Sequence, residues 1–334
     1  MTFGLFLEWF IKSLVVILSM TVGFAYVTWF ERRVLAKFQV RIGPNRAGKQ
    51  GLLQPVADAL KLIFKEELVP AKADKFIFIL APVLTMIPAL IITGVVPWGP
   101  SITLFGKTFT LSVADINLGA LYILTVTSIS IYGITLAGWS SNNKYATLGG
   151  LRATAQMISY ELALGLSFIG PILIAGTMSI TGIVEAQKNL WFVVYQPLGV
   201  IIYMIATVAE INRSPFDMPE AEQELTAGYH VEYSGMKFAL FFMAEYIKMI
   251  AICMIGASLF LGGYQGPFLD QAPWLGPIYL FIKIVALLFV LVWVRATLPR
   301  IRYDRLMAFG WKILFPLALL NVMVTALVII LVGG

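Results

Sequence analysis

Eight long apolar stretches set the architecture that this chain can adopt. They lie near residues 5–30, 76–97, 114–139, 153–175, 190–211, 237–261, 276–296 and 312–332. A hydrocarbon core of about 30 Å is crossed by about 20 apolar residues in helical form. With 59% hydrophobic and 13% charged residues, the chain has more apolar surface than a soluble core of 334 residues can bury. We therefore predict an all-α integral membrane protein, a single membrane domain over 1–334 with eight transmembrane helices.

The positions of Lys and Arg predict how these helices are oriented. The loops after the first, third, fifth and seventh stretches hold 19 of the 24 basic residues, whereas the other three loops hold only Lys107 and Lys188. Cytoplasmic loops of membrane proteins carry an excess of Lys and Arg. We expect a multi-pass membrane protein with both termini outside. Topology also explains the net charge of +6, so no nucleic-acid partner is expected.

The predicted cytoplasmic loop at 31–75 contains an amphipathic segment at 52–67. Apolar and charged side chains take opposite sides of a helix there: Leu52, Val56, Leu60 and Ile63 against Asp58, Lys61 and Lys65. A helix this short and this charged cannot span a bilayer, and we expect it to lie flat at the membrane surface. Packing of its polar face against a partner protein remains an alternative.

A second local pattern lies on the expected exterior. Residues 102–113 alternate apolar and polar side chains around Gly106-Lys107, which predicts a small β-hairpin.

The stretch 210–236 concentrates acidic residues between two apolar runs. Against Arg213 it carries six of the 18 acids of the chain, Glu210, Asp217, Glu220, Glu222, Glu224 and Glu232. Carboxylates this close raise one another's pKa and therefore hold protons loosely. A solvated acidic loop is the simpler interpretation. Because Phe216, Met218 and Leu225 are interleaved with the acids, we favour a packed, functional segment.

Ionisable residues within the apolar stretches indicate a polar path, because charges inside a membrane are costly. Glu161 lies in the fourth stretch. Glu245 lies in the sixth, with Lys248 three residues on and on the same helical face, so we predict an ion pair between them. Asp115 and Lys283 lie nearer to stretch ends, where snorkelling to the interface explains them.

Metal and redox sites are not expected within the chain. It has one cysteine, Cys253, and one histidine, His230. Iron–sulfur clusters need several thiolates, and zinc sites need three or four suitable ligands.

Several motifs in a fixed order resemble one known family. The resemblance covers residues 26 to about 311, and it is carried by Glu-Arg-Arg-Val-Leu at 31–35, Arg-Ile-Gly-Pro-Asn-Arg at 41–46, the segment 51–62, Ile-Ser-Tyr-Glu at 158–161, Ala-Glu-Ile-Asn-Arg-Ser-Pro-Phe-Asp at 209–217, Met-Ala-Glu-Tyr at 243–246 and the segment 295–304. These segments are similar to the H subunits, the quinone-site membrane subunits, of the proton-pumping NADH:quinone oxidoreductases, respiratory complex I.

The resemblance implies a membrane subunit that encloses a quinone chamber together with the peripheral arm. The basic residues of that chamber would be Arg32, Arg295 and Arg300. The proton path would comprise Glu210, Asp217, Glu220, Glu222 and Glu224, continuing to Glu161 and to Glu245 with Lys248 beside it. Quinone would be the substrate, the flavin and iron–sulfur clusters would lie in partner subunits, and the other partners would be further membrane and peripheral-arm subunits and the lipid bilayer.

Two other classes of protein share some of these features. A self-contained ion-coupled transporter also has charges within its spans, although this chain shows no two-half internal repeat. The homologous membrane subunit of a membrane-bound hydrogenase would have similar acids without a quinone. Soluble partners that bring either a flavin or a nickel–iron site would distinguish these alternatives.

Overall fold

Long helices that run side by side form the body of the protein. The computed structural model describes residues 3–104, 107–217, 228–269 and 271–333. Within this part, seven helical segments are long and apolar enough to cross a membrane. They are α1 (Phe3–Phe38), α3 (Lys75–Ile92), α4 (Gly119–Ser140), α5 (Lys144–Ala175), α10 (Gly235–Phe260), α11 (Leu275–Thr297) and a continuous run of α12 (Tyr303–Phe309), η3 (Gly310–Leu314) and α13 (Phe315–Gly333). The predicted helical membrane architecture is confirmed at this level.

The fifth predicted span, 190–211, is interrupted. It consists of α7 (Phe192–Tyr195) and α8 (Pro197–Glu210), with Gln196 between them at φ −128° and ψ 52°. A proline disfavours helical geometry in the residue before it, which explains the break. The Gln196 side chain donates to Thr325 Oγ1 (2.6 Å) and accepts from Asn321 Nδ2 (3.0 Å), both on α13. The polar groups at the break are therefore satisfied inside the bundle.

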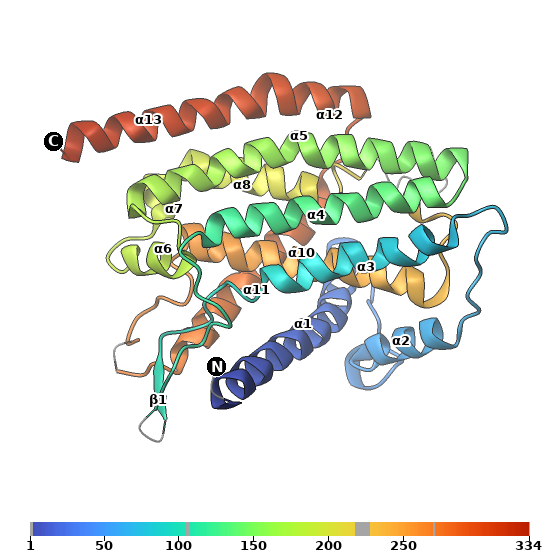
Figure 1. The fold of residues 1–334 in the computed structure, drawn as a ribbon, viewed down its shortest axis with the longest axis horizontal. Helices are drawn as coiled ribbons and strands as arrows, with labels where there is room; N and C mark the ends of the chain where they lie inside the picture. Colours follow the sequence, from blue (N-terminus) through green and yellow to red (C-terminus); the bar gives the residue numbers. More distant parts are fainter. Residues whose placement is uncertain (1–2, 105–106, 218–227, 270, 334) are drawn as a thin grey trace.

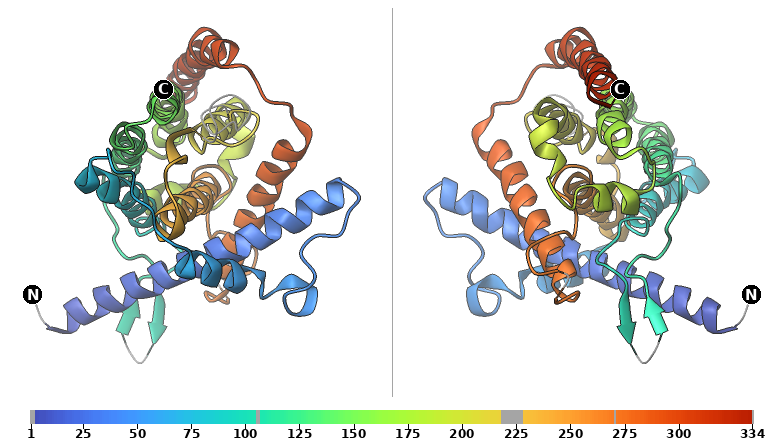
Figure 2. Two further views of the ribbon diagram at one scale, coloured as in Figure 1. Left: turned by 90° about the vertical axis from the view of Figure 1, so that its right-hand side faces the viewer. Right: turned by 90° about the vertical axis from the view of Figure 1, so that its left-hand side faces the viewer.

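Helix α10 lies at the centre of the bundle. In its most apolar window 67% of the residues are buried, against 6% for α1. It packs against α1, α3, α8 and α11, while α4 and α5 continue the row from α3 and α13 covers α5 (Figure 1). Helix α1 crosses the others obliquely (Figure 2). Charged residues of α10 are consequently enclosed on several sides.

The connections gather at two opposite ends of the bundle. One end carries η1 (Lys49–Gly51), α2 (Gln54–Phe64), η2 (Gly228–His230) and the turns that join α4 to α5 and α11 to α12. We call it the basic end, because the Lys- and Arg-rich loops lie there. The other end carries α6 (Ile180–Ala186), β1 and α7, and the chain begins and ends on that side (Figure 1).

Two short predicted elements have counterparts in the structure. The amphipathic segment predicted at 52–67 is α2, at 54–64, and each side chain of its apolar stripe exposes 42% or more of its area. The stretch predicted as a hairpin contains β1 (Ile102–Leu104) and β2 (Lys107–Phe109), paired antiparallel. Helix α1 runs to Phe38, so the first part of the predicted 31–75 loop is helical.

Helices α3 and α4 approach each other closely at Gly133. A Cβ atom on Gly133 would lie 2.8 Å from the carbonyl oxygen of Ala81 and 2.8 Å from the backbone nitrogen of Thr85. Backbone atoms cannot move aside without shifting a helix. At Gly165 of α5, by contrast, the nearest atom to an added Cβ would be 3.8 Å away, at Leu124 Cδ1.

We expect Gly133→Ala and Gly165→Ala to change stability in opposite directions. Both replacements favour the helix by roughly 0.5–1 kcal/mol, but overpacking at residue 133 costs about 1–3 kcal/mol. The Gly133 variant should therefore lower the apparent melting temperature of the detergent-solubilised protein, and the Gly165 variant should maintain or raise it. Equal melting temperatures would contradict the close approach of α3 and α4.

Candidate functional site

A turn after α8 carries charged side chains into the bundle. Asn212 adopts a left-handed conformation with φ 55°, which asparagine tolerates. The turn is held by Gln156 of α5, whose fully buried amide nitrogen lies near three acceptors: Ala209 O (2.8 Å), Asn212 Oδ1 (3.0 Å) and Phe216 O (2.9 Å). Helix α5 thus fixes the segment that bears Glu210 and Arg213.

Arg213 is the centre of a buried ion cluster between α1, α10 and α11. Its Nη1 lies 3.1 Å from Oε1 of Glu31, its Nε contacts Glu245, and its guanidinium carbon lies 4.5 Å from the centroid of the Tyr246 ring. Arg295 contacts the same oxygen of Glu31. We call these five residues the arginine cluster. Two arginines face two glutamates, so the cluster balances its own charge.

Burial and neighbouring charges act in opposite directions on Arg213. Burial alone lowers the pKa of an arginine. The pKa of Arg213 nevertheless lies well above its ordinary value, because Glu245, Tyr246 and Glu31 surround the guanidinium. Arg213 is therefore a permanent cation at this position.

A cavity of about 320 Å³ adjoins the arginine cluster at the basic end. We call it the interfacial cavity. Its lining combines charged residues, among them Glu31, Arg32, Arg213, Asp217, Glu245 and Arg295, with the aromatic residues Tyr229, Phe238, Phe241, Phe242 and Tyr246. Such a lining suits a ligand with an apolar ring and polar oxygen atoms.

The three arginines predicted for a quinone chamber gather around this cavity. Arg32 and Arg295 line it, and Arg32 pairs with Asp58 of α2 at 2.6 Å. Arg300 pairs at 3.0 Å with Asp217, which lines the cavity. Burial raises the pKa of Asp217, and the guanidinium groups of Arg300 and Arg295 oppose that rise.

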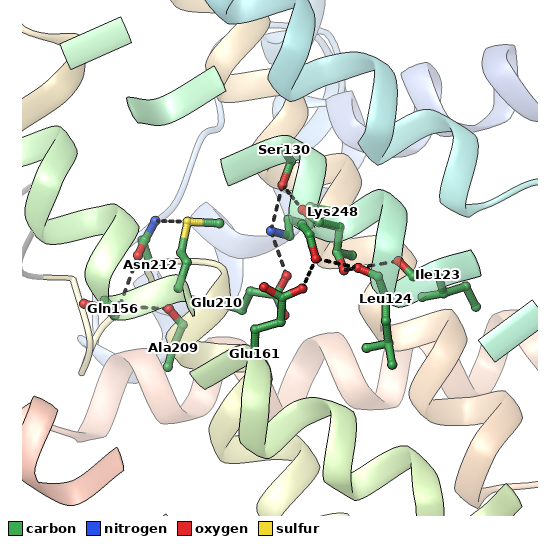
Figure 3. Close-up of polar contacts among 12 residues, drawn as sticks. Ile123, Leu124, Ser130, Gln156, Glu161, Ala209, Glu210, Asn212 and Lys248 are labelled. Carbon is green, nitrogen blue, oxygen red and sulfur yellow. Dashed lines mark hydrogen bonds and ion pairs between the residues drawn. The ribbon is translucent and has the colours of Figure 1, made fainter. Parts of the chain in front are cut away.

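Deeper in the bundle, Glu161, Glu210 and Lys248 converge from three helices (Figure 3). The ammonium group of Lys248 lies 2.9 Å from Glu210 Oε1 and donates to Ser130 Oγ at 3.3 Å. Glu161 contacts the hydroxyl group of Ser128. We call Glu161, Glu210 and Lys248 the inner cluster.

A small cavity of about 40 Å³ connects the two clusters. It is lined by Glu210 and Lys248 of the inner cluster, and it shares Tyr229, Phe241 and Glu245 with the interfacial cavity. Because roughly 10–15 Å³ of such volume is enough to hold a water molecule, the cavity has room for water. Polar groups therefore follow one another from the basic end to Glu161.

The predicted ion pair between Glu245 and Lys248 is wrong. Glu245 contacts Arg213, and Lys248 pairs with Glu210. The two residues do share a helical face, as their spacing predicts, but each meets an opposite charge from the end of α8 and the following turn. Ion pairs between α10 and the end of α8 with its following turn therefore take the place of the predicted pair within α10.

Other predicted residues have varied positions. Glu232 accepts a hydrogen bond from Asn143 (2.6 Å), and Asp115 accepts from Ser179 and Thr181 at the start of α6. Lys283 donates to the carbonyl oxygens of Leu261, Gly263 and Gln265 at 2.7–2.8 Å. The predicted proton-path residues Glu220, Glu222 and Glu224 lie outside the described residues.

Sequence reasoning did not assign a role to Glu31, to Ser128 or to Ser130. Glu31 follows an apolar run directly, which made it resemble the first residue of a loop, whereas α1 continues past it and buries it to 3% exposure. The serines carry no charge to single them out. Among the described residues, no three of the His, Cys, Asp and Glu side chains are placed to hold a metal ion.

Comparison with known proteins identifies the family. A family model described as NADH dehydrogenase matches residues 11–326. The chain belongs to the NADH dehydrogenase family.

Two similar members of the family are both named as H subunits of NADH-quinone oxidoreductase. A Syntrophobacter fumaroxidans protein, named as an H subunit of NADH-quinone oxidoreductase, is 49% identical over 334 residues, covering 98% of this chain and 99% of its own length. A Thermomicrobium roseum protein with the same designation is 50% identical over 324 residues, covering 94% of each chain. The predicted resemblance to the H subunits of complex I is confirmed, and these names favour it over the hydrogenase and transporter alternatives.

The pair of Asp217 with Arg300 predicts a pH-dependent loss of stability in Arg300→Gln. Because its pKa is raised, Asp217 favours the folded state at low pH, and that contribution is lost as pH rises through the raised pKa. Without the guanidinium group of Arg300, the pKa of Asp217 rises further. The free energy of unfolding of the variant, followed by thermal denaturation in detergent, should therefore match that of the parent at acidic pH. Above neutral pH it should fall below the parent by about 0.5–1 kcal/mol, the upper part of the range for ion pairs near the surface.

Arg302→Gln is the matched control for this measurement. Arg302 pairs at 2.8 Å with Asp304, and both side chains are exposed, so its melting temperature should follow the parent at every pH. In a variant that also carries Asp217→Asn, the Arg300 replacement should cost nothing further. A pH-independent loss in Arg300→Gln would show that its guanidinium acts on something other than Asp217.

Proposed function

We propose that the chain is the membrane subunit of a proton-translocating NADH:quinone oxidoreductase. In this proposal the interfacial cavity is the membrane part of the quinone chamber, and the groups beyond it couple quinone reduction to proton movement. The observation that carries the proposal is the position of Glu245, which lines both the interfacial cavity and the cavity that reaches Glu210 and Lys248.

The lining of the interfacial cavity fits a quinone. Aromatic side chains suit the ring and the first isoprenoid units, and guanidinium groups donate hydrogen bonds to carbonyl oxygens. Conversion of a quinone to a quinol takes up two electrons and two protons. Flavin and iron–sulfur clusters in partner subunits would supply the electrons from NADH. Arg32 and Arg295 would stabilise the negative charge that develops on the quinone oxygens before protons arrive.

The arginine cluster would convert that change in charge into proton movement. Glu245 holds Arg213 on one side and borders the 40 Å³ cavity on the other. A new negative charge in the chamber favours the protonated form of nearby carboxyl groups. Proton uptake at Glu245 would weaken its hold on Arg213 and alter the field at Glu210 and Lys248, from which Glu161 continues the path. Glu220, Glu222 and Glu224 follow Asp217 in sequence and would extend the path at the basic end.

Quinone would enter from the bilayer beside α2. This helix packs against α1 and α10, and its apolar stripe is exposed. An apolar cavity of about 340 Å³ lies between α1, α10 and α11. A surface of this kind suits the hydrophobic tail of a membrane-soluble substrate. The polar side of α2 would face the peripheral arm, and further membrane subunits would cover other helices.

Glu245→Gln tests the coupling role, because the amide keeps the shape of the side chain and removes its charge. In membranes from cells that carry this variant, NADH oxidation by an artificial acceptor should persist. Quinone-dependent oxidation and proton pumping should fall in parallel, on the order of tenfold, which corresponds to about 1.4 kcal/mol.

Glu8→Gln is the matched control, because Glu8 also pairs with a cation, Lys12 at 2.7 Å, but lies in the first turns of α1. All three activities should survive in it. If quinone reduction and pumping both persist in Glu245→Gln, the arginine cluster only stabilises the fold and the coupling proposal fails.

We further propose that α7 and α8 together form an eighth crossing, with the basic end in the cytoplasm. Residues 192–210 would span roughly 28 Å as helix, close to the ~30 Å hydrocarbon thickness. An even number of crossings agrees with a chain that begins and ends on the same side (Figure 1). The location would be a bacterial inner membrane, with both termini outside.

A reporter that fluoresces only in the cytoplasm tests this topology. Fused after residue 334, it should stay dark. Fused after Asn143, in the turn between α4 and α5 at the basic end, it should be bright. The reverse pattern would overturn the orientation, and a bright signal from both fusions would overturn the eighth crossing.

A further inference from the structure

The inner cluster contains two carboxyl groups and one ammonium group. Lys248 lies 2.9 Å from Glu210, which is 2% exposed. The Glu161 carboxyl points toward the same pair (Figure 3). One cation balances one carboxylate. Glu161 is part-buried and adds a second carboxyl group without a cation of its own. A carboxyl group that is withdrawn from water and lacks a cation favours its protonated form.

The hydroxyl group of Ser130 shows how a serine serves this cluster. Its oxygen lies 2.7 Å from the carbonyl oxygen of Thr127 and 3.3 Å from the ammonium group of Lys248. A hydroxyl group has one proton, and an ammonium group can only donate. Ser130 therefore donates to the Thr127 carbonyl oxygen and accepts from Lys248.

Ser128 stands in the same relation to Glu161. Its oxygen lies 3.0 Å from the carbonyl oxygen of Leu124 and in contact with Oε1 of Glu161. Its single proton cannot serve two acceptors fully. When the Ser128 hydroxyl proton points to the Leu124 carbonyl oxygen, Ser128 can only accept from Glu161. The contact is then a hydrogen bond only if Glu161 is protonated and donates. When Glu161 is ionised, the serine proton must turn toward it.

We propose that the inner cluster holds one transferable proton beyond that of the lysine, carried on Glu161, and that Ser128 is the positioning residue that accommodates its arrival and departure. On departure the O–H bond of Glu161 breaks, and the proton passes to a water molecule, which carries it out of the cluster as hydronium. The hydroxyl proton of Ser128 then rotates from the Leu124 carbonyl oxygen to the new carboxylate. No electrons move, and the charge of the cluster falls by one.

The groups that face Glu161 come from three neighbouring helices. They are Ser128 from α4, Glu210 from α8 and Lys248 from α10. Glu245 and Arg213 lie beyond the 40 Å³ cavity and form their own pair. Lys312 of η3, which also packs on α5, is exposed at the bundle surface. The proton count of the inner cluster therefore depends on Glu161, Glu210 and Lys248.

The inference rests on the proposed function only in placing Glu161 on a proton path, so its test includes a readout independent of activity. Infrared spectra of the purified complex should show a protonated-carboxyl C=O band at neutral pH that disappears in Glu161→Gln. In Ser128→Ala the band should move to higher wavenumber and persist to higher pH, because the hydrogen-bond acceptor and the donor to the ionised form are both lost. Ser128→Thr should restore its position.

Proton pumping provides the second readout. The alkaline limb of its pH profile should shift upward in Ser128→Ala and return in Ser128→Thr. Thr125→Val is the matched control, because Thr125 lies on the exposed face of α4 and its hydroxyl group donates to the Leu121 carbonyl oxygen within its own helix. It should change neither the band nor the profile.

The possible outcomes separate the two proposals. Absence of a Glu161-dependent band at neutral pH, or a band unmoved in Ser128→Ala, would overturn the inference. A band that behaves as expected while Glu161→Gln pumps normally would support the proton count and remove Glu161 from the proposed path.

Discussion

The compensation of charges inside a low-dielectric bundle is the constraint on which this structure depends. Glu245 and Lys248 lie one turn apart on α10, and Glu210 and Arg213 lie three residues apart at the end of α8 and in the turn after it. The four form two crossed pairs, Lys248 with Glu210 and Arg213 with Glu245. Removing one member of a buried pair costs about 3–5 kcal/mol, because its partner is left uncompensated. These pairs therefore hold the end of α8 in register with α10.

The two clusters built on these pairs differ in charge balance. The arginine cluster has two cations for two carboxylates, and it borders a cavity large enough for a substrate head group. The inner cluster has one cation for two carboxyl groups and borders a cavity with room for a water molecule. A negative charge placed beside the balanced cluster favours proton uptake by one of its carboxylates, which weakens an ion pair. The cluster with an excess acid can exchange a proton without breaking a pair. This order suits a protein in which substrate chemistry at one end drives proton movement further inside.

The surrounding fold keeps these groups in place and leaves a route to them. Gln156 holds the turn that bears Glu210 and Arg213, and a polar contact between Gln196 and α13 closes the break before α8. On the opposite side, α1 crosses obliquely, and α2 presents an apolar stripe that stays exposed among the described residues. The polar interior is thus enclosed by helices on most sides, and exposed apolar side chains lie near it on α1 and α2.

The membrane architecture, the amphipathic helix and the family could be predicted from the sequence, because hydropathy, helical periodicity and contiguous motifs are local properties. The family resemblance also predicted a shared role for Arg32, Arg295 and Arg300, and the structure brings the first two and the Asp217 partner of the third to the interfacial cavity. Pro197 is a local signal for the break at Gln196. Because hydropathy is averaged over the whole apolar stretch 190–211, that signal did not interrupt the predicted span. The ion pairs could not be predicted from the sequence. Helical spacing states which side chains share a face, as Glu245 and Lys248 do, but not which charge a neighbouring helix presents to that face. Opposite charges from another element displaced the pair within α10, and the length of α1 turned Glu31 from an apparent loop residue into a buried partner of Arg213 and Arg295.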